Sequence, residues 1–144
     1  KIATAESCTA GTLPKRLTDI PGSSEVFECG IVSYSNDIKM KLLGVSPETL
    51  DTYGAVSEQT AREMALGAKR VSGADIAIST TGLAGPGGDG VLPGGLSFVA
   101  VTDGNRVFVE KIVTGHENDR EYNRHVTATR ALNLVRLMLE EKIK

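Results

Sequence analysis

The residues with the richest chemistry stand together near the start of the sequence, where Ser7, Cys8 and Thr9 place a hydroxyl, a thiol and a second hydroxyl in a row. They follow a short apolar run, 1–5, and precede a helical pattern, 12–19. A strand that opens into a helix presents several free backbone N–H groups, and the helix dipole adds positive charge there. Such a turn suits a bound anion or a transition-state oxyanion, so Ser7 and Cys8 are both candidate nucleophiles.

A lysine and a tyrosine could activate such a nucleophile. Tyr34 follows the predicted strand 26–33, and Lys39 lies about one turn into the predicted helix 36–43. The positive end of a helix disfavours an ammonium group, and desolvation would lower the lysine pKa further, which makes a neutral amine available. That amine, or the Tyr34 hydroxyl bridging to it, could take the proton from Ser7 in a Ser–Lys mechanism.

A glycine-dense segment is the third feature of the sequence. Residues 81–95 contain seven glycines, and the segment is too long and too glycine-rich for a simple hairpin turn. It lacks the Gly-Lys-Ser or Gly-Lys-Thr ending of a P-loop, and it matches the dinucleotide fingerprint poorly. Thr81 and Gly82 open it directly after the predicted strand 75–80. Arg120, near the start of the last predicted helix, could meet a phosphate.

The elements that must position these residues follow the order β-α-β-α-α-β-loop-β-β-α. This order predicts a largely parallel sheet of about five strands with helices on both faces, and the last two strands, 96–102 and 106–114, should form a hairpin. The final helix, from 117 onward, is expected to bury Val126, Ala131, Leu132, Val135, Met138 and Leu139. Ligands bind beyond the carboxyl ends of parallel strands, where Ser7, Tyr34 and the glycine segment all fall.

Composition narrows the class of protein. The chain has 144 residues and a net charge of −2, which fits one domain, 1–144, and argues against a nucleic-acid partner. No apolar run approaches the roughly 20 residues that span a bilayer, so no membrane partner is expected. Cys8 and Cys29 lack metal-ligand spacing and the histidines are few, so neither a metal nor a cofactor is predicted. A reduced, cytoplasmic protein is the default for such cysteines.

A structural explanation competes with each catalytic one. Ser7 and Thr9 are favoured helix caps, and Lys39 could be a solvated helix lysine. Tyr34 could pack as an anchor at the end of its strand. Glu6 could act as a general base or accept neighbouring N–H groups. A non-catalytic nucleotide- or partner-binding module therefore stands beside an enzyme as an alternative.

The stretch Thr4-Ala5-Glu6-Ser7-Cys8-Thr9-Ala10-Gly11 resembles the signature of the CinA C-terminal domain family of competence/damage-inducible proteins. The resemblance continues in order through 17–24, 30–36, 43–45, 54–58, 81–88 and the pair 119–120. It implies a three-layer α/β/α sandwich that hydrolyses the carboxamide of nicotinamide mononucleotide, giving nicotinate mononucleotide and ammonia. It also implies a homo-oligomer.

The same resemblance implies a role for each residue of the site. Ser7 would be the nucleophile, with Tyr34 and Lys39 as the pair that handles its proton. The implied substrate-binding residues are Cys8, Thr9, Ala10, Gly11, Asn36, Thr81, Gly82 and Arg120. Backbone N–H groups of 7–10 or 81–82 would hold the oxyanion. The alternative is a non-catalytic nucleotide- or partner-binding module of a competence/damage-inducible protein. In that case, loss of the Ser7 hydroxyl would leave function intact.

Overall fold

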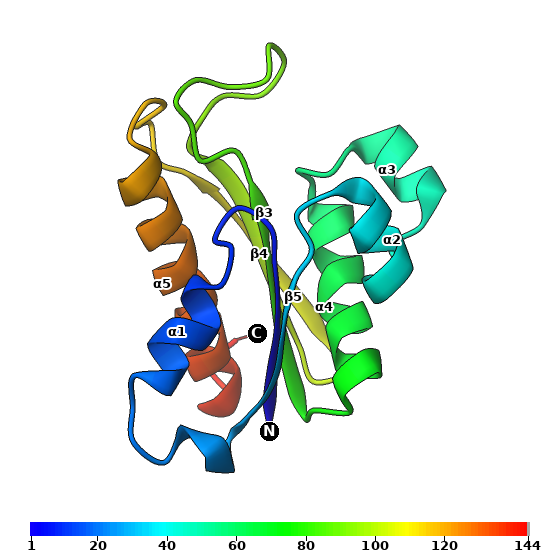
Figure 1. The fold of residues 1–144 in the computed structure, drawn as a ribbon, viewed down its shortest axis with the longest axis vertical. Coiled ribbons are helices and arrows are strands. Elements are labelled where there is room, and N and C mark those ends of the chain that lie inside the picture. Colours follow the sequence, from blue (N-terminus) through cyan, green and yellow to red (C-terminus); the bar gives the residue numbers. More distant parts are fainter. Residues whose placement is uncertain (144) are drawn as a thin grey trace.

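The sheet that the alternation of elements predicts is present. A computed structural model describes residues 1–143 and contains one sheet with the strand order β2-β1-β3-β4-β5 (Figure 1). The strands are β1 (Ile2–Glu6), β2 (Phe27–Val32), β3 (Ile76–Gly82), β4 (Leu96–Thr102) and β5 (Val107–Val113). β1 pairs in parallel with β2 and β3, whereas β4 pairs antiparallel with β3 and β5. Only β4 therefore runs against the other strands, which confirms the mostly parallel, mixed sheet.

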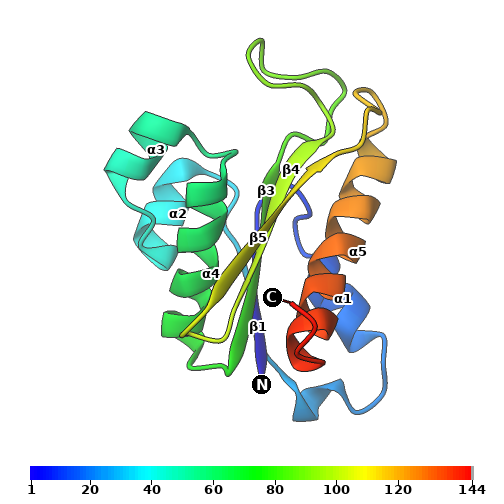
Figure 2. The ribbon, with the colours of Figure 1, turned by 180° about the vertical axis from the view of Figure 1, so that it is seen from behind.

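Helices cover both faces of this sheet, as Figure 1 and Figure 2 show from opposite sides. One face carries α1 (Thr12–Thr18) and α5 (Arg120–Leu139), and the 3-10 turn η1 (Ser23–Glu25) leads from α1 towards β2. The other face carries α2 (Asn36–Leu43), α3 (Pro47–Tyr53) and α4 (Glu58–Ser72). α4 packs on β1, β3 and β4, while α2 and α3 pack on α4. This arrangement confirms the predicted three-layer sandwich. Within residues 1–143, no helix has the length and apolar character needed to cross a bilayer.

The sequence of α4 explains how α2 comes close to the sheet. Ser57 caps α4 by accepting the N–H of Thr60 at 3.2 Å. The buried face of α4 consists largely of alanines, whose small side chains bring the helix near the strands. Gly67 lies against Leu43 of α2, and a Cβ at this glycine would overlap the Leu43 carbonyl. The absent side chain thus allows close packing of the helix that carries Lys39.

The long helix α5 buries most of the stripe that its apolar residues predict, together with two polar residues. Of the expected stripe, Ala131, Val135 and Met138 are buried, Val126 and Leu132 are partly buried, and Leu139 is 63% exposed. Two polar residues, Asn123 and Thr127, face inward instead, and each is hydrogen-bonded. The expectation for Leu139, the last residue of α5, was therefore wrong. Asn123 and Thr127 can be buried because their polar groups are hydrogen-bonded.

The glycine-dense segment forms a long hairpin that projects beyond the sheet (Figure 1 and Figure 2). It joins β3 directly to β4, so these two strands pair antiparallel, as do β4 and β5 in the final hairpin. At its base the Leu83 N–H donates to the Leu96 carbonyl at 2.9 Å, and the Gly95 N–H donates to the Leu83 carbonyl at 2.7 Å. The Asp89 carboxylate accepts the N–H groups of 91 and 92 and orders the outer turn.

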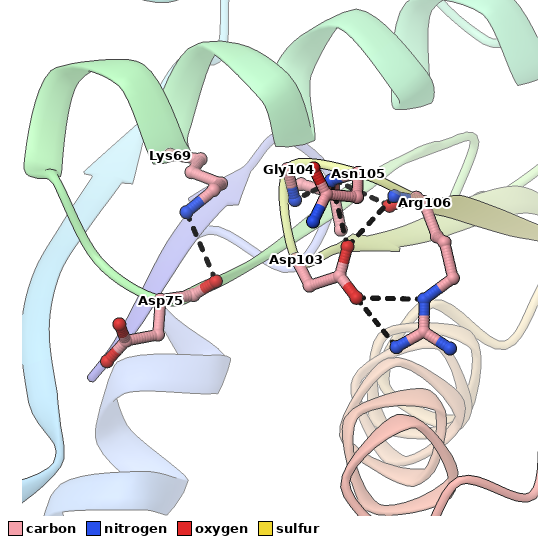
Figure 3. A network of polar contacts seen from close by, with 7 residues as sticks. Lys69, Asp75, Asp103, Gly104, Asn105 and Arg106 are labelled. Carbon is pink, nitrogen blue, oxygen red and sulfur yellow. Dashed lines mark hydrogen bonds and ion pairs between the residues drawn. The ribbon is translucent and has the colours of Figure 1, made fainter.

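A polar network closes the opposite end of the sheet, at the turn between β4 and β5 (Figure 3). The Asp103 carboxylate accepts the N–H groups of Asn105 and Arg106 and pairs with the Arg106 guanidinium. These hydrogen bonds lower the pKa of Asp103 to about 2. Beside the turn, Lys69 of α4 donates to the Asp75 carbonyl at 3.2 Å. This network belongs to the scaffold, because the candidate site lies at the other end of the strands.

Candidate active site

The turn between β1 and α1 brings Ser7 to the carboxyl edge of the sheet. The Ser7 N–H donates to the Thr80 carbonyl of β3 at 3.0 Å, and the Ser7 carbonyl accepts the Ala10 N–H at 3.1 Å. Ala10 and Gly11 have φ values of 45° and 98°, in the left-handed region where bulky residues are strained. These small residues let the chain reverse sharply and leave the Ser7 side chain at the sheet edge.

A buried carboxylate, that of Glu6, caps α1. It is fully buried and accepts the Leu13 N–H at 2.9 Å, the Gly11 N–H at 3.1 Å and the Thr9 hydroxyl at 2.7 Å. Burial raises the pKa of Glu6, although the three hydrogen bonds act in the opposite direction. The helix terminus that the sequence offers to an anionic ligand is therefore filled by the protein's own carboxylate. Of the two roles considered for Glu6, the geometry matches the cap.

Lys39 reaches the Ser7 hydroxyl from α2. Only 1% of Lys39 is exposed, and its Nζ lies 3.1 Å from Ser7 Oγ, 2.9 Å from the Ser33 carbonyl oxygen and 3.2 Å from the Tyr34 carbonyl oxygen. Desolvation lowers the pKa of Lys39. A neutral amine would donate its two N–H groups to the two carbonyls and direct its lone pair at the Ser7 hydroxyl. The three contacts thus suit a base that accepts the Ser7 proton.

The Tyr34 side chain turns away from this pair. It is 61% exposed, and its hydroxyl accepts a hydrogen bond from Arg120 Nη2 at 3.4 Å. Arg120 also donates to the Gly85 carbonyl at 2.6 Å, so it links Tyr34 to the glycine hairpin. Among residues 1–143, no hydrogen bond joins the Tyr34 hydroxyl to Ser7 or Lys39. Among the hydrogen bonds of residues 1–143, the one between Tyr34 and Lys39 involves the Tyr34 backbone carbonyl.

A cavity of about 360 Å³ opens beside Ser7 and Lys39. The predicted site residues that line it are Ser7, Cys8, Tyr34, Asn36, Lys39, Thr81, Gly82 and Arg120. Thr9, Ala10 and Gly11 lie outside this lining, in the capped turn behind Ser7. The Thr81 hydroxyl donates to the Ala55 carbonyl at 2.6 Å, so it fastens the wall of the cavity. A volume of about 360 Å³ lies within the range of small-molecule sites.

The second candidate nucleophile, Cys8, is a buried thiol. Desolvation raises its pKa to about 12, and the nearby charge of Glu6 acts in the same direction. A thiol with this pKa stays protonated near neutral pH, and the thiolate is the reactive form. Ser7, which contacts a buried amine, is therefore the stronger candidate.

Sequence reasoning missed two parts of the site. Residues 55–56 and 83–88, which form walls of the cavity, lie within the family resemblance and, for 83–88, the glycine segment, but no site role was predicted for them because they carry no reactive side chain. No site role was predicted for Arg124 from the sequence, yet its guanidinium donates to the carbonyls of Cys8 and Thr9. Its spacing of four residues from Arg120 was the available signal, because the two lie on the same side of a helix. Within residues 1–143, no group of side chains has the make-up of a metal site.

Comparison with known proteins assigns this chain to a family. The profile of the CinA C-terminal domain matches residues 1–139. The chain belongs to the CinA C-terminal domain family. A CinA-like protein of Chloroherpeton thalassium is 50% identical over 143 residues, which is 96% of this chain and 34% of that protein. The chain therefore spans about a third of the length of this curated CinA relative.

Solved CinA structures share the fold. The competence/damage inducible protein CihA from Agrobacterium tumefaciens is 44% identical, with a TM-score of 0.89 over 93% of this chain and 82% of that one. A CinA superfamily protein from Escherichia coli is 32% identical, with a TM-score of 0.90 over 96% of this chain and 80% of that one. The chain thus shares its sandwich with these two proteins over nearly its whole length.

Proposed function

We propose that this CinA domain hydrolyses the carboxamide of nicotinamide mononucleotide to nicotinate mononucleotide and ammonia. The observation that supports the proposal most directly is the 3.1 Å contact between Lys39 Nζ and Ser7 Oγ at the wall of a cavity. A serine hydroxyl beside a desolvated amine is the arrangement of a Ser–Lys acyl-transfer enzyme. The family resemblance supplies the identity of the substrate.

The proposed reaction has two halves. Ser7 Oγ attacks the amide carbon while its proton passes to the neutral Lys39 amine, and the Lys39 ammonium then gives this proton to the amide nitrogen, so that the C–N bond breaks and ammonia leaves. Water then attacks the ester while Lys39 takes its proton, and Lys39 returns that proton to Ser7 Oγ as the ester bond breaks, which releases the nicotinate product and restores Ser7 and the neutral amine. Tyr34 and Ser33 orient the Lys39 amine through their carbonyls.

Backbone N–H groups beside Ser7 are the proposed oxyanion donors. In the part of the chain that the structure describes, the N–H groups of Cys8 and Thr9 have no hydrogen-bond acceptor, whereas those of Ser7, Ala10 and Gly11 do. Donors that are already fixed in place stabilise a developing negative charge without reorganisation. Arg120 and Asn36, at the cavity wall, are the proposed contacts of the substrate phosphate and ribose.

The test is release of ammonia from purified protein at millimolar nicotinamide mononucleotide. We expect Ser7→Ala to abolish release, while Ser24→Ala, a matched change at an exposed serine of η1, leaves the rate unchanged. A wild-type protein that binds the nucleotide but releases no ammonia above background would refute hydrolysis and favour the non-catalytic binding module. Activity that survives in Ser7→Ala and disappears in Cys8→Ala would transfer the nucleophile to Cys8.

A further inference from the structure

A guanidinium from the far end of the chain holds the turn that carries Ser7. Arg124 lies on α5, and its Nε donates to the Cys8 carbonyl at 3.0 Å while its Nη2 donates to the Thr9 carbonyl at 3.1 Å. The residue is half-buried, and it is absent from the lining of the Ser7 cavity. Arg124 lines a second cavity instead, together with Asp119 and Arg120, and its two hydrogen bonds to the turn fall on the backbone behind Ser7.

The planarity of the peptide bond gives these contacts a consequence for the other side of the turn. In a trans peptide the C=O and the following N–H point in opposite directions. Holding the Cys8 carbonyl on the α5 side therefore directs the Thr9 N–H the other way. The Ser7 carbonyl is held likewise by the Ala10 N–H, which directs the Cys8 N–H. Among residues 1–143 these are the two N–H groups of the turn that lack an acceptor.

The turn is thus fixed by two opposite charges that act on opposite backbone groups. Glu6 accepts N–H groups of the turn and of the first residues of α1, and Arg124 donates to its carbonyls. A guanidinium suits this task because its donors form a rigid fork that reaches two acceptors at once, whereas the lysine ammonium is a point charge on a flexible stem. Loss of the fork would leave Ser7 attached to its strand but free to shift relative to Lys39.

We propose that Arg124 is a positioning residue that sets the distance between Ser7 Oγ and Lys39 Nζ and aims the N–H groups of Cys8 and Thr9. The inference rests on the proposed amide hydrolysis for its catalytic meaning. The clamp, by which we mean the two hydrogen bonds from Arg124 to the Cys8 and Thr9 carbonyls, fixes the backbone whether or not the protein hydrolyses an amide. A shift of about 1 Å in a reacting group can cost roughly a hundredfold in rate, and removing one oxyanion donor costs about 100- to 1,000-fold in kcat.

The test compares Arg124→Met and Arg124→Lys with Arg136→Met, a matched arginine substitution on the exposed side of α5. We expect Arg124→Met to lower kcat by about 10- to 100-fold with KM changed less than about twofold, because the residue acts on the turn and not on the substrate. Arg124→Lys should recover part of kcat, since an ammonium can still reach one carbonyl. Arg136→Met should match the wild type, and thermal melting should show that all variants are folded.

Amide hydrogen exchange of the turn provides a readout that needs no activity. Arg124→Met should accelerate exchange at the Gly11 and Leu13 N–H groups, which the clamped turn presents to Glu6. If wild-type protein releases no ammonia, the proposed function fails and exchange alone decides the clamp. Unchanged kcat in an active protein, or a raised KM at unchanged kcat, would overturn the positioning role. Unchanged exchange at Gly11 and Leu13 would overturn the clamp itself.

Discussion

Replacing Lys39 by methionine should alter catalysis and, separately, the pH dependence of stability. Burial lowers the pKa of Lys39 below its usual value near 10.5 in the folded protein. The unfolded chain keeps the usual value, so between the two pKa values the unfolded state binds a proton that the folded state does not. The free energy of unfolding of the wild type therefore rises with pH across this window. Methionine carries no proton, so Lys39→Met lacks the rise.

The magnitude follows from linkage. One proton bound by the unfolded state alone gives a slope of about 1.4 kcal/mol per pH unit in the free energy of unfolding. The slope begins at the folded pKa of Lys39 and ends near pH 10.5. Its sign is opposite to that of a lysine paired with a carboxylate, whose raised pKa makes stability fall as pH rises. The proposed base must be neutral, so kcat/KM should rise about tenfold per pH unit below the same folded pKa.

The assay is urea denaturation of wild type and Lys39→Met at a series of pH values between about 6 and 10.5. Subtracting the two free energies cancels the other titrating groups of the fold. Lys41→Met is the matched control, because Lys41 lies on the same helix with its side chain exposed, and its curve should run parallel to that of the wild type. The pH profile of kcat/KM is measured on the wild type under the same conditions.

Two results would refute the reasoning. A constant difference between wild type and Lys39→Met across the whole pH range would mean that the buried amine keeps its proton in the folded state. An inflection in kcat/KM at a pH where the stability difference is still flat would mean that another group is the base. The reasoning requires the onset of the slope and the inflection to coincide, because both report the same Lys39 proton.

The remaining predictions concern the two ends of the sheet. Glu6→Gln replaces one carboxylate oxygen by an NH2 group that cannot accept the N–H of Leu13 or Gly11. We expect urea denaturation to show that the free energy of unfolding falls by about 1.5–3 kcal/mol. An unchanged midpoint would show that the cap is dispensable. Asp103 has a pKa of about 2, below its unfolded value of 3.8, so its contribution is present above pH 3.8 and lost as pH falls towards 2. Asp103→Ala should therefore lower the melting temperature at neutral pH and have little effect near pH 2, and an equal decrease at both pH values would contradict this account.

Much of the fold follows from local signals in the sequence. The capping residues Ser35, Ser46 and Ser57 each accept an N–H of the first turn of their helix. The alternation of these helices with apolar runs predicts parallel strands, and parallel strands end at a common edge. That rule was enough to predict that Ser7, Tyr34 and the glycine segment lie at the same edge of the sheet. It could not give the distance from Ser7 to Lys39, which depends on how closely α2 packs against α4.

The features that the sequence did not reveal depend on long-range contacts. The antiparallel pairing of β3 with β4 depends on hydrogen bonds at the base of the hairpin, between Leu83 and residues 95–96. The glycines of the hairpin show no sequence pattern that predicts this pairing. The inward placement of Asn123 requires acceptors at Ala84 and His116, which are distant or turn residues. Arg124 meets the Ser7 turn only because α5 returns to lie beside α1. Asn123 and Arg124 thus face inward because acceptors are present, and most of these acceptors lie far away in the sequence.

The position of Glu6 explains why the amine of Lys39 can lose its proton. A carboxylate next to a buried lysine would normally form an ion pair and raise the lysine pKa. Glu6 precedes Ser7 directly, yet its oxygens are directed at N–H groups of the turn and of α1 and at the Thr9 hydroxyl. The atoms that contact Lys39 Nζ are two neutral carbonyls and the Ser7 hydroxyl. By capping the helix, Glu6 is withheld from the amine, so desolvation dominates and lowers the pKa of Lys39, the proposed base beside Ser7.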